Sequence, residues 1–565
     1  MEACKDYNNI KEMMLDLAKQ IPNHIAFIKK IKENQYQDIT YEKFVEDINC
    51  FGTALYSMGL KDARIAIVGR NQYEWALAHT SNLFGGIVSV PLDKELKYVE
   101  LEESLIRSKA QAIVFDEKYE EEIRKLKEEG KTNLKQFICM SEIEGYPSVN
   151  QLITEGKKLI ESGENKYLSY EVDSNKMSIL LFTSGTTSKS KAVMLSQRNL
   201  TSNIYGMLQH EKFYEDDTNI AFLPYHHIFG STAMFVMLAA KVKTVYCDGI
   251  RYISKNFKEY KVSVFVGVPA ILEAIYKNIW KNIEKQGKTK LMKTLIKVSN
   301  FLRMIHIDIR RKIFKPVIKE LGGALRFIVS GGAALDKQIE DGFRDLGIDV
   351  AQGYGLTETA PVIAAETYFK EQSGTIGIPL PNVTLEIVDQ DENGIGELRV
   401  KGPNVMLGYY EDEERTNEVL KDGWFYTGDL GYIDQKGFIH LTGRRKDMIV
   451  LKNGKKVFPE EIESLINRNE LVKECMVYGK PENGDKNDLQ VAVKVVYDKD
   501  KREQLYPGKT EKELFEIVWN EIKELNQRFP TYKHIKSLVL TDQELIKTTT
   551  QKIKRQEELK QLMGE

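Results

Sequence analysis

Cysteine is scarce in this chain, and long uncharged apolar stretches are missing. The 565 residues include five cysteines, which are dispersed and show no C-x-x-C spacing. This usage excludes a disulfide-stabilised secreted scaffold and favours reduced thiols. No uncharged apolar run approaches the roughly 18 residues that span a bilayer, and the first residues are polar, unlike a secretory signal. We therefore expect a cytoplasmic protein.

An excess of either charge is missing as well. Lysine and arginine number 81 and aspartate and glutamate 83, which gives a formal net charge of −2. Such a balance provides no global attraction to nucleic acid, and no nucleic-acid partner is expected. The apolar fraction, 42%, is typical of globular proteins. Because 565 residues exceed what one hydrophobic core normally serves, we expect at least two domains.

Strand-like and helical segments alternate over most of the chain. Residues 1–60 are predicted to be helical, with a break at Pro22. Apolar runs predict strands at 64–69, 86–92, 110–115, 134–140, 179–182, 219–223, 243–247, 262–268 and 325–329. Such alternation is typical of parallel sheets covered by helices, in which ligands bind at the carboxyl ends of strands. The predicted fold class is therefore α/β.

The pattern changes near Thr375. Short alternating segments with frequent turns predict an antiparallel β-subdomain there. After G-R-R-K-D (443–447) come a helix from Pro459, strands at 489–496 and 536–540, and a helix at 513–527. We expect a large domain, 1–445, and a small mobile α+β domain, 446–565, hinged on a short charged connection.

One stretch, M-S-I-L-L-F-T-S-G-T-T-S-K-S-K-A-V-M-L-S (177–196), combines a buried strand with a polar loop. The loop offers small residues, hydroxyls and an ammonium group, from Thr183, Ser184, Gly185, Thr186, Thr187 and Lys191. Oriented N–H groups, hydroxyls and one positive charge suit phosphate oxygens. The G-x-x-x-x-G-K-[ST] pattern is absent, so this is no Walker A loop, and a plain polar turn is the alternative. Ser196 is predicted to cap the next helix.

Four later stretches follow this loop in the order of one known family. They are Q-G-Y-G-L-T-E-T (352–359), Y-T-G-D (426–429), G-R-R-K-D (443–447) and T-T-T-Q-K-I-K-R (548–555). From about residue 20 to its end, the chain resembles the adenylate-forming superfamily of acyl-CoA synthetases, luciferases and peptide-synthetase adenylation domains. Through G-V-P-A-I-L-E-A-I-Y (267–276) and K-N-G-K-K-V-F-P-E-E-I-E (452–463), it is most similar to long-chain fatty acid–CoA ligases.

The resemblance implies an AMP-forming ligase that uses ATP, Mg²⁺ and coenzyme A. A medium- or long-chain carboxylate would attack the α-phosphate of ATP and release pyrophosphate, and the acyl-adenylate would then react with the thiol of CoA. Both first reactants are anionic, so charge compensation and positioning would carry the catalysis. An acyl–carrier-protein synthetase and an aryl or short-chain acid ligase are the alternatives, together with a nucleotide-binding scaffold that does not turn over. Chain length and oligomeric state stay open.

The resemblance also implies catalytic roles. Lys552 would bridge the substrate carboxylate and the α-phosphate, and Glu358 with Thr186 would hold Mg²⁺. His227 would line the acyl pocket. The loop from Thr183 to Lys191 would hold the β- and γ-phosphates.

Further residues would contact the nucleotide or CoA, or serve as the hinge. They are Gly332, Ala333, Gln352, Gly353, Tyr354, Thr357, Asp429, Arg444, Lys446 and Gly454. Tyr354 would face adenine, and Asp429 would accept both ribose hydroxyls. Lys446 would act as the hinge, and the Gly454 loop would serve the thiol step.

Some residues depart from the family pattern or stand outside it. Ser188, Ser190 and Ala192 occupy positions where the family usually has glycine, proline and glycine, and serine reaches positive φ less easily than glycine. Two adjacent histidines without cysteine or carboxylate partners at ligand spacing do not indicate zinc, so we expect His226 to be merely packed or solvated. Lys547, Lys554 and Arg555 are expected to be surface charge.

The region 270–320 is rich in lysine and arginine. Its apolar face, Leu272, Ile275, Ile279 and Ile283, predicts amphipathic helices packed on the large domain with a solvated basic face. The alternative is attraction to anionic lipid, which would make the protein peripheral at a membrane surface.

Overall fold

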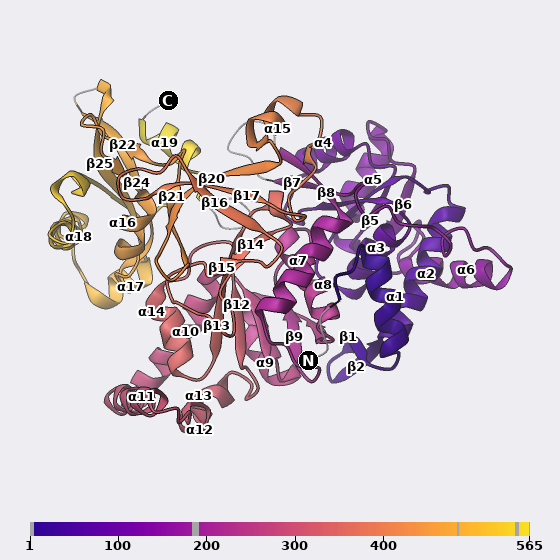
Figure 1. The fold of residues 1–565 in the computed structure, drawn as a ribbon, viewed down its shortest axis with the longest axis horizontal. Helices are drawn as coiled ribbons and strands as arrows, with labels where there is room; N and C mark the ends of the chain where they lie inside the picture. The colour runs from indigo at the N-terminus through magenta and orange to yellow at the C-terminus, as the bar shows by residue number, and fades with distance from the viewer. Residues whose placement is uncertain (1–4, 184–190, 483–484, 548–552, 564–565) are drawn as a thin grey trace. The chain divides into compact units, whose positions relative to one another are not determined.

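The computed structural model describes residues 5–183, 191–482, 485–547 and 553–563 (Figure 1). They form two compact units. The first contains the described residues up to Thr183 together with Lys191–Leu385 and Val400–Phe425. The second contains Glu386–Arg399 and the described residues from Tyr426 onward. The domain boundary expected between residues 445 and 446 falls inside the second unit and stays a prediction.

A seven-stranded sheet in the first unit follows the order β18-β8-β7-β4-β3-β5-β6. Its strands are β3 Arg64–Val68, β4 Val88–Leu92, β5 Ala112–Phe115, β6 Gln136–Cys139, β7 Met177–Thr183, β8 Lys191–Ser196 and β18 Gly408–Tyr409. Strands β3 to β7 pair in parallel, whereas β8 runs antiparallel to both β7 and β18. The inner strands are continuous apolar runs because helices bury both faces of such a sheet.

A nine-stranded sheet in the same unit follows the order β15-β14-β13-β12-β11-β9-β10-β1-β2. The strands are β1 Ile25–Lys32, β2 Gln35–Thr40, β9 Thr218–Ala221, β10 Lys243–Tyr246, β11 Val264–Gly267, β12 Phe327–Ser330, β13 Asp349–Gly355, β14 Val362–Ala365 and β15 Ile378–Pro379. The six strands from β13 to β1 pair in parallel, and both edges are antiparallel. The predicted α/β class is confirmed.

The N-terminal segment corrects one expectation. Residues 1–60 are not all helical, because Ile25–Lys32 and Gln35–Thr40 form an antiparallel hairpin at the sheet edge. Most side chains of β2 are exposed, so the apolar periodicity that announces a strand is weak there. The break at Pro22 is confirmed, since the first helix ends at Gln20.

Helices pack on the sheets of the first unit. They are α1 Ile10–Gln20, α2 Tyr41–Ser57, α3 Tyr73–Phe84, α4 Tyr98–Ser108, α5 Glu120–Glu129, α6 Val149–Glu161, α7 Gln197–His210, α8 Ile228–Ala239, α9 Ile253–Tyr260, α10 Pro269–Lys285, α11 Thr289–Met304, α12 Arg310–Ile313, α13 Lys315–Glu320, α14 Lys337–Asp345 and α15 Glu413–Val419. One apolar core joins Phe265, Ile328 and Val350 of the nine-stranded sheet to α9, α10 and α14. The expected face of α10 is confirmed, since Leu272, Ile279 and Ile283 are buried in this core. No helix of the described residues is long and apolar enough to cross a membrane.

Three further sheets follow. A five-stranded sheet contains β16 Thr384–Val388, β17 Gly396–Lys401, β19 Leu420–Lys421, β20 Trp424–Ile433 and β21 Ile439–Arg444, and its pairings of β20 with β19 and β21 are antiparallel, as expected. A short hairpin, β22 Ile449–Val450 and β23 Lys456–Val457, comes next. The last sheet is β24 Val472–Glu482, β25 Asp485–Tyr497 and β26 Ser537–Thr541, packed with α16 Pro459–Ile466 and α18 Glu511–Asn526. Helices α17 Lys499–Leu505 and α19 Arg555–Met563 complete the second unit.

Candidate active site

The predicted phosphate loop joins two strands rather than a strand and a helix. Strand β8 was not predicted; it runs antiparallel to β7, and Thr183 stands opposite Lys191 in the register. Ser196 then caps α7, because its Oγ accepts from the N–H of Asn199 at 3.2 Å, as predicted. The two ends of the loop, Thr183 and Lys191, are therefore neighbours on adjacent strands of the sheet.

Several predicted residues lie outside the described residues. They are Ser184, Gly185, Thr186 and Thr187, the two departures Ser188 and Ser190, and Lys552. Their assigned roles stay predictions. Near Lys552, the expectation of surface charge is wrong for Arg555, whose mostly buried guanidinium donates to Glu463 at 2.5 Å and to the Val477 carbonyl at 3.2 Å.

Lys191 and Glu358 are brought together by Tyr409. The Lys191 ammonium donates to the Tyr409 hydroxyl at 3.3 Å, and that hydroxyl donates to Oε1 of Glu358 at 2.8 Å. Burial and the Glu358 charge raise the pKa of Tyr409, so the phenol stays protonated and keeps its donor role. Tyr409 arrives through the pairing of β18 with β8, a contact between distant segments that no local sequence pattern announced.

Local backbone packing positions Glu358. It lies in a single 3₁₀ turn, Thr357–Thr359, directly after β13. A Cβ at Gly355 would come within 1.8 Å of the Pro361 carbonyl oxygen, so only glycine permits this close chain reversal. The Glu358 carbonyl accepts from the N–H of Met406 at 2.8 Å, and the carboxylate is half-buried. A half-open carboxylate is a suitable ligand for a hard cation.

The loop after β12 is open to solvent. Gly332 has φ +85° and is exposed, as is Ala333, and a Cβ at Gly332 would meet nothing nearer than 3.7 Å. Gln352 on the neighbouring strand holds this loop, since its Oε1 accepts from the N–H of Leu335 at 2.6 Å and its Nε2 donates to the Thr375 carbonyl at 2.7 Å. Gln352 therefore has a supporting position, and its contact with nucleotide stays a prediction.

Gly353, Tyr354 and Thr357 follow Gln352 at the carboxyl end of β13. A Cβ at Gly353 would approach nothing closer than 3.9 Å, while Tyr354 is 9% exposed. The end of β13 and the Gly332 loop lie on adjacent strands, because Ser330 pairs with Gln352. Their position matches the strand-end location expected for a ligand site in this fold class.

In the second unit, Asp429 and Arg444 meet across two strands. They stand opposite each other on β20 and β21, and Nε of Arg444 lies 3.0 Å from Oδ1 of Asp429. Glu397, which sequence reasoning missed, holds both neighbours: it accepts from the N–H of Gly428 at 3.0 Å and pairs with Arg445 at 2.8 Å. Its buried place in the strand G-E-L-R was the available signal.

Lys446 and Gly454 are exposed in the second unit. Lys446 lies in the turn that follows β21. Gly454 closes the β22–β23 hairpin with φ +77°, a conformation that favours glycine, and open space surrounds its Cβ position. Neither placement assigns a ligand, and both roles stay predictions.

His227 begins helix α8 as its N-cap residue and is half-buried. The premise that the two histidines lack a carboxylate partner is wrong, because Asp93 Oδ1 lies 3.2 Å from Nε2 of His226. His226 is packed, as expected, and its ring lies 4.3 Å from the ring of His227, centroid to centroid. Asp93 stands far from the histidines in the sequence, so the pattern could not reveal it.

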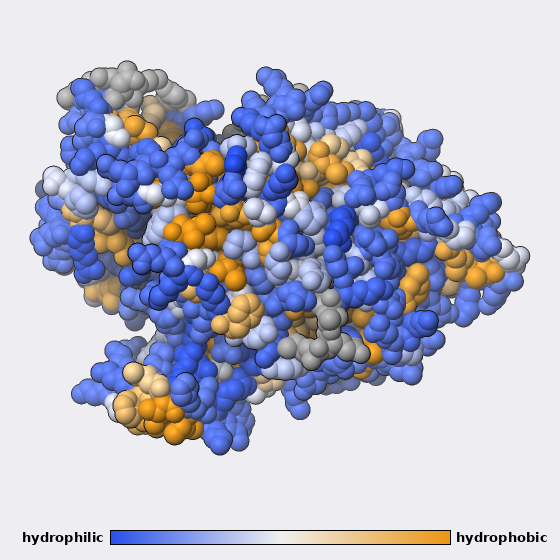
Figure 2. Space-filling view, in the orientation of Figure 1, coloured by the Kyte–Doolittle hydropathy of each residue, from blue (hydrophilic) through white to orange (hydrophobic). Residues whose placement is uncertain are grey.

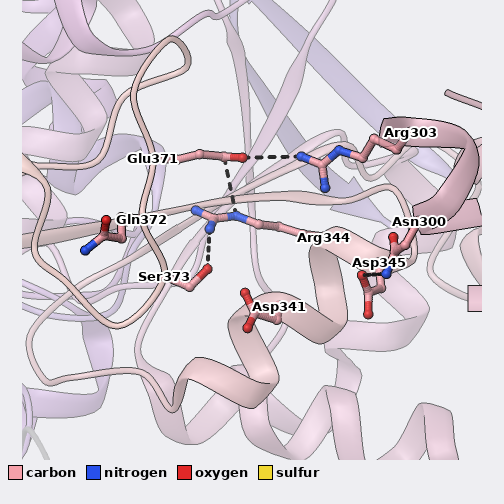
Figure 3. A pocket seen from close by; sticks show the side chains of 8 residues that line it. All are labelled: Asn300, Arg303, Asp341, Arg344, Asp345, Glu371, Gln372 and Ser373. Carbon is pink, nitrogen blue, oxygen red and sulfur yellow. Dashed lines mark hydrogen bonds and ion pairs between the residues drawn. The ribbon is translucent and has the colours of Figure 1, made fainter. Parts of the chain in front are cut away.

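A polar pocket in the first unit lies beside a buried ion cluster (Figure 3). Arg344 on α14 pairs with Glu340 at 3.0 Å and Glu366 at 2.9 Å, and more weakly with Glu371 at 3.5 Å. Burial, and then the hydrogen bond with Glu366 and the charge of that residue, raise the pKa of Glu340 to about 8, against the opposing effect of Arg344. Glu366 also accepts from the N–H of Gln352 at 3.1 Å, so this cluster supports the strand that carries the site residues.

Comparisons with known proteins identify the family of the chain. Residues 16–410 match the model of the AMP-binding enzyme family, and residues 446–565 match that of the AMP-binding enzyme C-terminal domain. The chain is 27% identical to Long-chain-fatty-acid–CoA ligase FadD15 of Mycobacterium bovis over 490 residues, which cover 84% of this chain and 80% of that protein. It is also 27% identical to the chloroplastic long-chain-fatty-acid–[acyl-carrier-protein] ligase AEE15 of Arabidopsis thaliana, covering 86% and 76%.

A solved structure shares the fold. The anthranilate CoA ligase AuaEII in complex with anthranoyl-AMP superposes with a TM-score of 0.76 at 19% identity, covering 99% of each chain. At that identity the likeness concerns the fold alone. Because the first family model matches well over half of the sequence, the chain belongs to the AMP-binding enzyme family.

Proposed function

We propose that the chain is an ATP-dependent fatty acid–CoA ligase. It would join a medium- or long-chain carboxylate to the α-phosphate of ATP with loss of pyrophosphate, and then transfer the acyl group to the thiol of CoA with loss of AMP. The observation that carries the proposal is the Lys191–Tyr409–Glu358 network, which places a cation and an anion at the end of the predicted phosphate loop. Adenylate-forming ligases use ATP, Mg²⁺ and coenzyme A.

The described residues fit these cofactors chemically. Glu358 offers a half-open carboxylate, the ligand type that Mg²⁺ prefers, and would hold that ion, which compensates phosphate charge when bound. Lys191 would compensate phosphate charge directly, while Gly332 and Ala333 leave room for a nucleobase. Asp429 would accept the ribose hydroxyls, and Arg444 would orient that carboxylate.

The choice of acid and acceptor follows from the relatives and defines the alternatives. One relative is named for long-chain acids with CoA, and another for long-chain acids with acyl carrier protein. We assign CoA as the acceptor because 452–463, with its glycine turn at Gly454, resembles the CoA ligases. Supplying CoA or acyl carrier protein to the enzyme with radiolabelled fatty acid separates these outcomes, and thioester formed only on carrier protein would overturn the assignment.

Adenylation is tested by exchange of labelled pyrophosphate into ATP across fatty acids of increasing chain length and one aryl acid. We expect exchange that depends on a fatty acid and is lost in Lys552→Ala. Lys554→Ala is the matched control, because this neighbouring lysine pairs with Glu557 at 3.1 Å and is assigned no catalytic role. No exchange with any acid would favour a nucleotide-binding scaffold, and exchange with the aryl acid alone would overturn the fatty-acid assignment.

The proposal includes peripheral contact with an anionic membrane through helix α11. This helix carries four basic residues and no acidic one. Its apolar residues Leu291, Val298 and Phe301 are 55%, 47% and 62% exposed, and Met304, Ile305 and Ile307 extend the patch. Figure 2 shows this apolar surface at the lower left, over α11 of Figure 1.

The arrangement fits a lipid surface better than solvent. Leu291, Val298 and Phe301 recur on one helix face, and Lys290, Lys293 and Lys297 lie on the adjacent face by the same periodicity. An exposed apolar face bordered by lysines is typical of helices that lie in the interface of anionic bilayers. This attraction would bring the protein to the lipid bilayer, in which its proposed fatty-acid substrate dissolves.

Vesicle co-sedimentation tests the contact with the full-length chain. We expect binding to vesicles that contain phosphatidylglycerol, little binding to phosphatidylcholine alone, and a several-fold loss in Phe301→Ser. Val99→Ser is a matched control, since Val99 is 61% exposed on α4. Equal binding of both variants, or a concentration-dependent dimer without vesicle binding, would assign the patch to another partner.

A further inference from the structure

Asp93, His226 and His227 form a compact group of metal-ligating side chains. Among the described residues, this is the one set of three or more such groups whose ligand atoms all lie within 4.8 Å of one another. The imidazole of His226 is 4% exposed, and the carboxylate of Asp93 is 15% exposed. Two imidazoles and one carboxylate are the ligands of many three-residue zinc sites.

The contact between His226 and Asp93 has an unusual geometry. Their Nε2 and Oδ1 atoms lie 3.2 Å apart, but within the described part of the chain the buried Nε2 has no hydrogen-bond partner. The pair His440 and Asp434 provides a contrast, because there Nε2 and Oδ2 lie 3.0 Å apart in a hydrogen bond. Oδ1 of Asp93 accepts from the N–H of Glu95 at 2.9 Å and keeps a second lone pair, so a third partner shared with Nε2 of His226 would complete both atoms.

The group links the two large sheets of the first unit. Asp93 follows β4 of the seven-stranded sheet, while the histidines follow β9 of the nine-stranded sheet. Asn71, which follows β3, fixes the histidine loop by donating to the carbonyls of Ala221 and Leu223 at 3.2 and 2.7 Å and accepting from the N–H of Tyr225 at 2.9 Å. Asn71 therefore fixes the chain just before the two histidines.

We propose that Asp93, His226 and His227 bind one divalent transition-metal ion, with Zn²⁺ as the expected class. Two imidazoles favour Zn²⁺ over Mg²⁺ and Ca²⁺, which prefer all-oxygen ligands. Three protein ligands leave one tetrahedral position open to solvent or a small ligand. Its three ligands do not include Glu358, whose carboxylate we assign to Mg²⁺, so the two ions would differ in ligand chemistry.

Cobalt binding to the metal-free full-length chain tests the site. Co²⁺ reports its own coordination through visible ligand-field absorption, and added Zn²⁺ should displace it. We expect one Co²⁺ per chain with a tetrahedral spectrum, and an affinity at least about 10-fold weaker in both Asp93→Asn and His226→Asn. His440→Asn is the matched control and should bind as the unmodified chain does.

The outcomes are separable. Absence of a tetrahedral band in the unmodified chain, or a band kept at full affinity in either ligand variant, would overturn the site. Circular dichroism checks that the variants fold. If His226→Asn does not fold because that ring is buried, Asp93→Asn decides alone, since its carboxylate lies near the surface.

A consequence for catalysis rests on the proposed function. His227 is the residue assigned to the acyl pocket, so bound Zn²⁺ would fix its ring and slow acid-dependent pyrophosphate exchange. Zn²⁺ should then inhibit the unmodified enzyme more than Asp93→Asn. Because cobalt binding is read without turnover, failure of the ligase assignment and failure of the metal site give different results.

Discussion

Two ion networks of the first unit contrast in burial and in partners. Arg344, Glu340 and Glu366 form a cluster in which no side chain is more than 7% exposed. Lys191, Tyr409 and Glu358 form the other network, in which lysine and carboxylate are half-buried and meet through one phenol. The first network satisfies its charges internally, whereas the second presents charges at the ends of strands.

The contrast indicates different roles: the buried cluster supports the backbone, and the open network is the candidate for chemistry. In the buried cluster, Glu366 binds the backbone of Gln352, and Gln352 in turn holds the loop of Gly332. Such a cluster fixes a strand but offers no group to a substrate. The open network keeps a cation and an anion half-buried, and we propose that they act on phosphate and Mg²⁺. Variants of the buried cluster should therefore lose stability, whereas variants of the open network should lose reaction rate.

The largest effect should come from Arg344→Met. Removing the cation leaves the buried carboxylate of Glu366 unpaired, and breaking a buried pair in this way costs about 3–5 kcal/mol of the free energy of unfolding. Arg415→Met is the control, since its pair with Asp412 at 3.7 Å is partly exposed and contributes about 1 kcal/mol or less. Urea denaturation measures both. Equal losses would contradict a special role for the buried cluster.

Glu358→Gln should give the next largest effect, on rate rather than stability. Without the negative charge, the site would lose the ligand that we propose for Mg²⁺, and pyrophosphate exchange should fall on the order of 10²–10³-fold. The thermal midpoint should hardly change because the carboxylate is half-buried. Glu413→Gln, an exposed carboxylate of α15, controls for lost charge. Normal exchange in Glu358→Gln would remove this network from the active site.

Much of the fold could be predicted because the signals are local. Parallel strands such as Arg64–Val68 and Val264–Gly267 are short apolar runs, and caps such as Ser196 are read from neighbouring residues. Strand β8 was missed because a strand of the same sheet follows the loop where the pattern suggested a helix. The hairpin at 25–40 was missed because an exposed edge strand has no clear period.

The site could be predicted only in part, for a similar reason. Glu358 and Asp429 stand in motifs of several residues, so the resemblance could propose them for the site. Long-range contacts could not be predicted, because the partners of Tyr409, Glu397 and Asp93 lie far away in the sequence and no local pattern indicates them. Tertiary pairing, not propensity, decides where such residues act.

The buried cluster should also make the stability of the fold depend on pH. The pKa of Glu340 is about 8 when folded, against 4.5 for an ordinary glutamate, so the folded state binds the proton more tightly than the unfolded state. Stability should therefore fall as pH rises from about 4.5 to about 8. Glu340→Gln should flatten that slope and raise the thermal midpoint by a few degrees at pH 8 relative to the unmodified chain. An unchanged slope would contradict a neutral, buried Glu340.

The smallest effect is expected for Tyr409→Phe, which removes one hydroxyl and leaves the ring that Lys191 overlies at 4.9 Å. A single hydrogen bond to a charged group contributes roughly 1.5–3 kcal/mol, but water can replace part of it in a half-open site, so we expect a loss of about 10-fold or less. Because the Tyr409 hydroxyl donates to Glu358, we expect it to position that carboxylate, and the loss should appear mainly as a higher Mg²⁺ requirement. Tyr410→Phe is the neighbouring control, because the Tyr410 ring packs on Arg64 and Lys109 instead. If Tyr409→Phe changes the free energy of unfolding but not the Mg²⁺ requirement, the phenol has a stabilising role like that of the buried cluster. The two networks would then differ in burial alone.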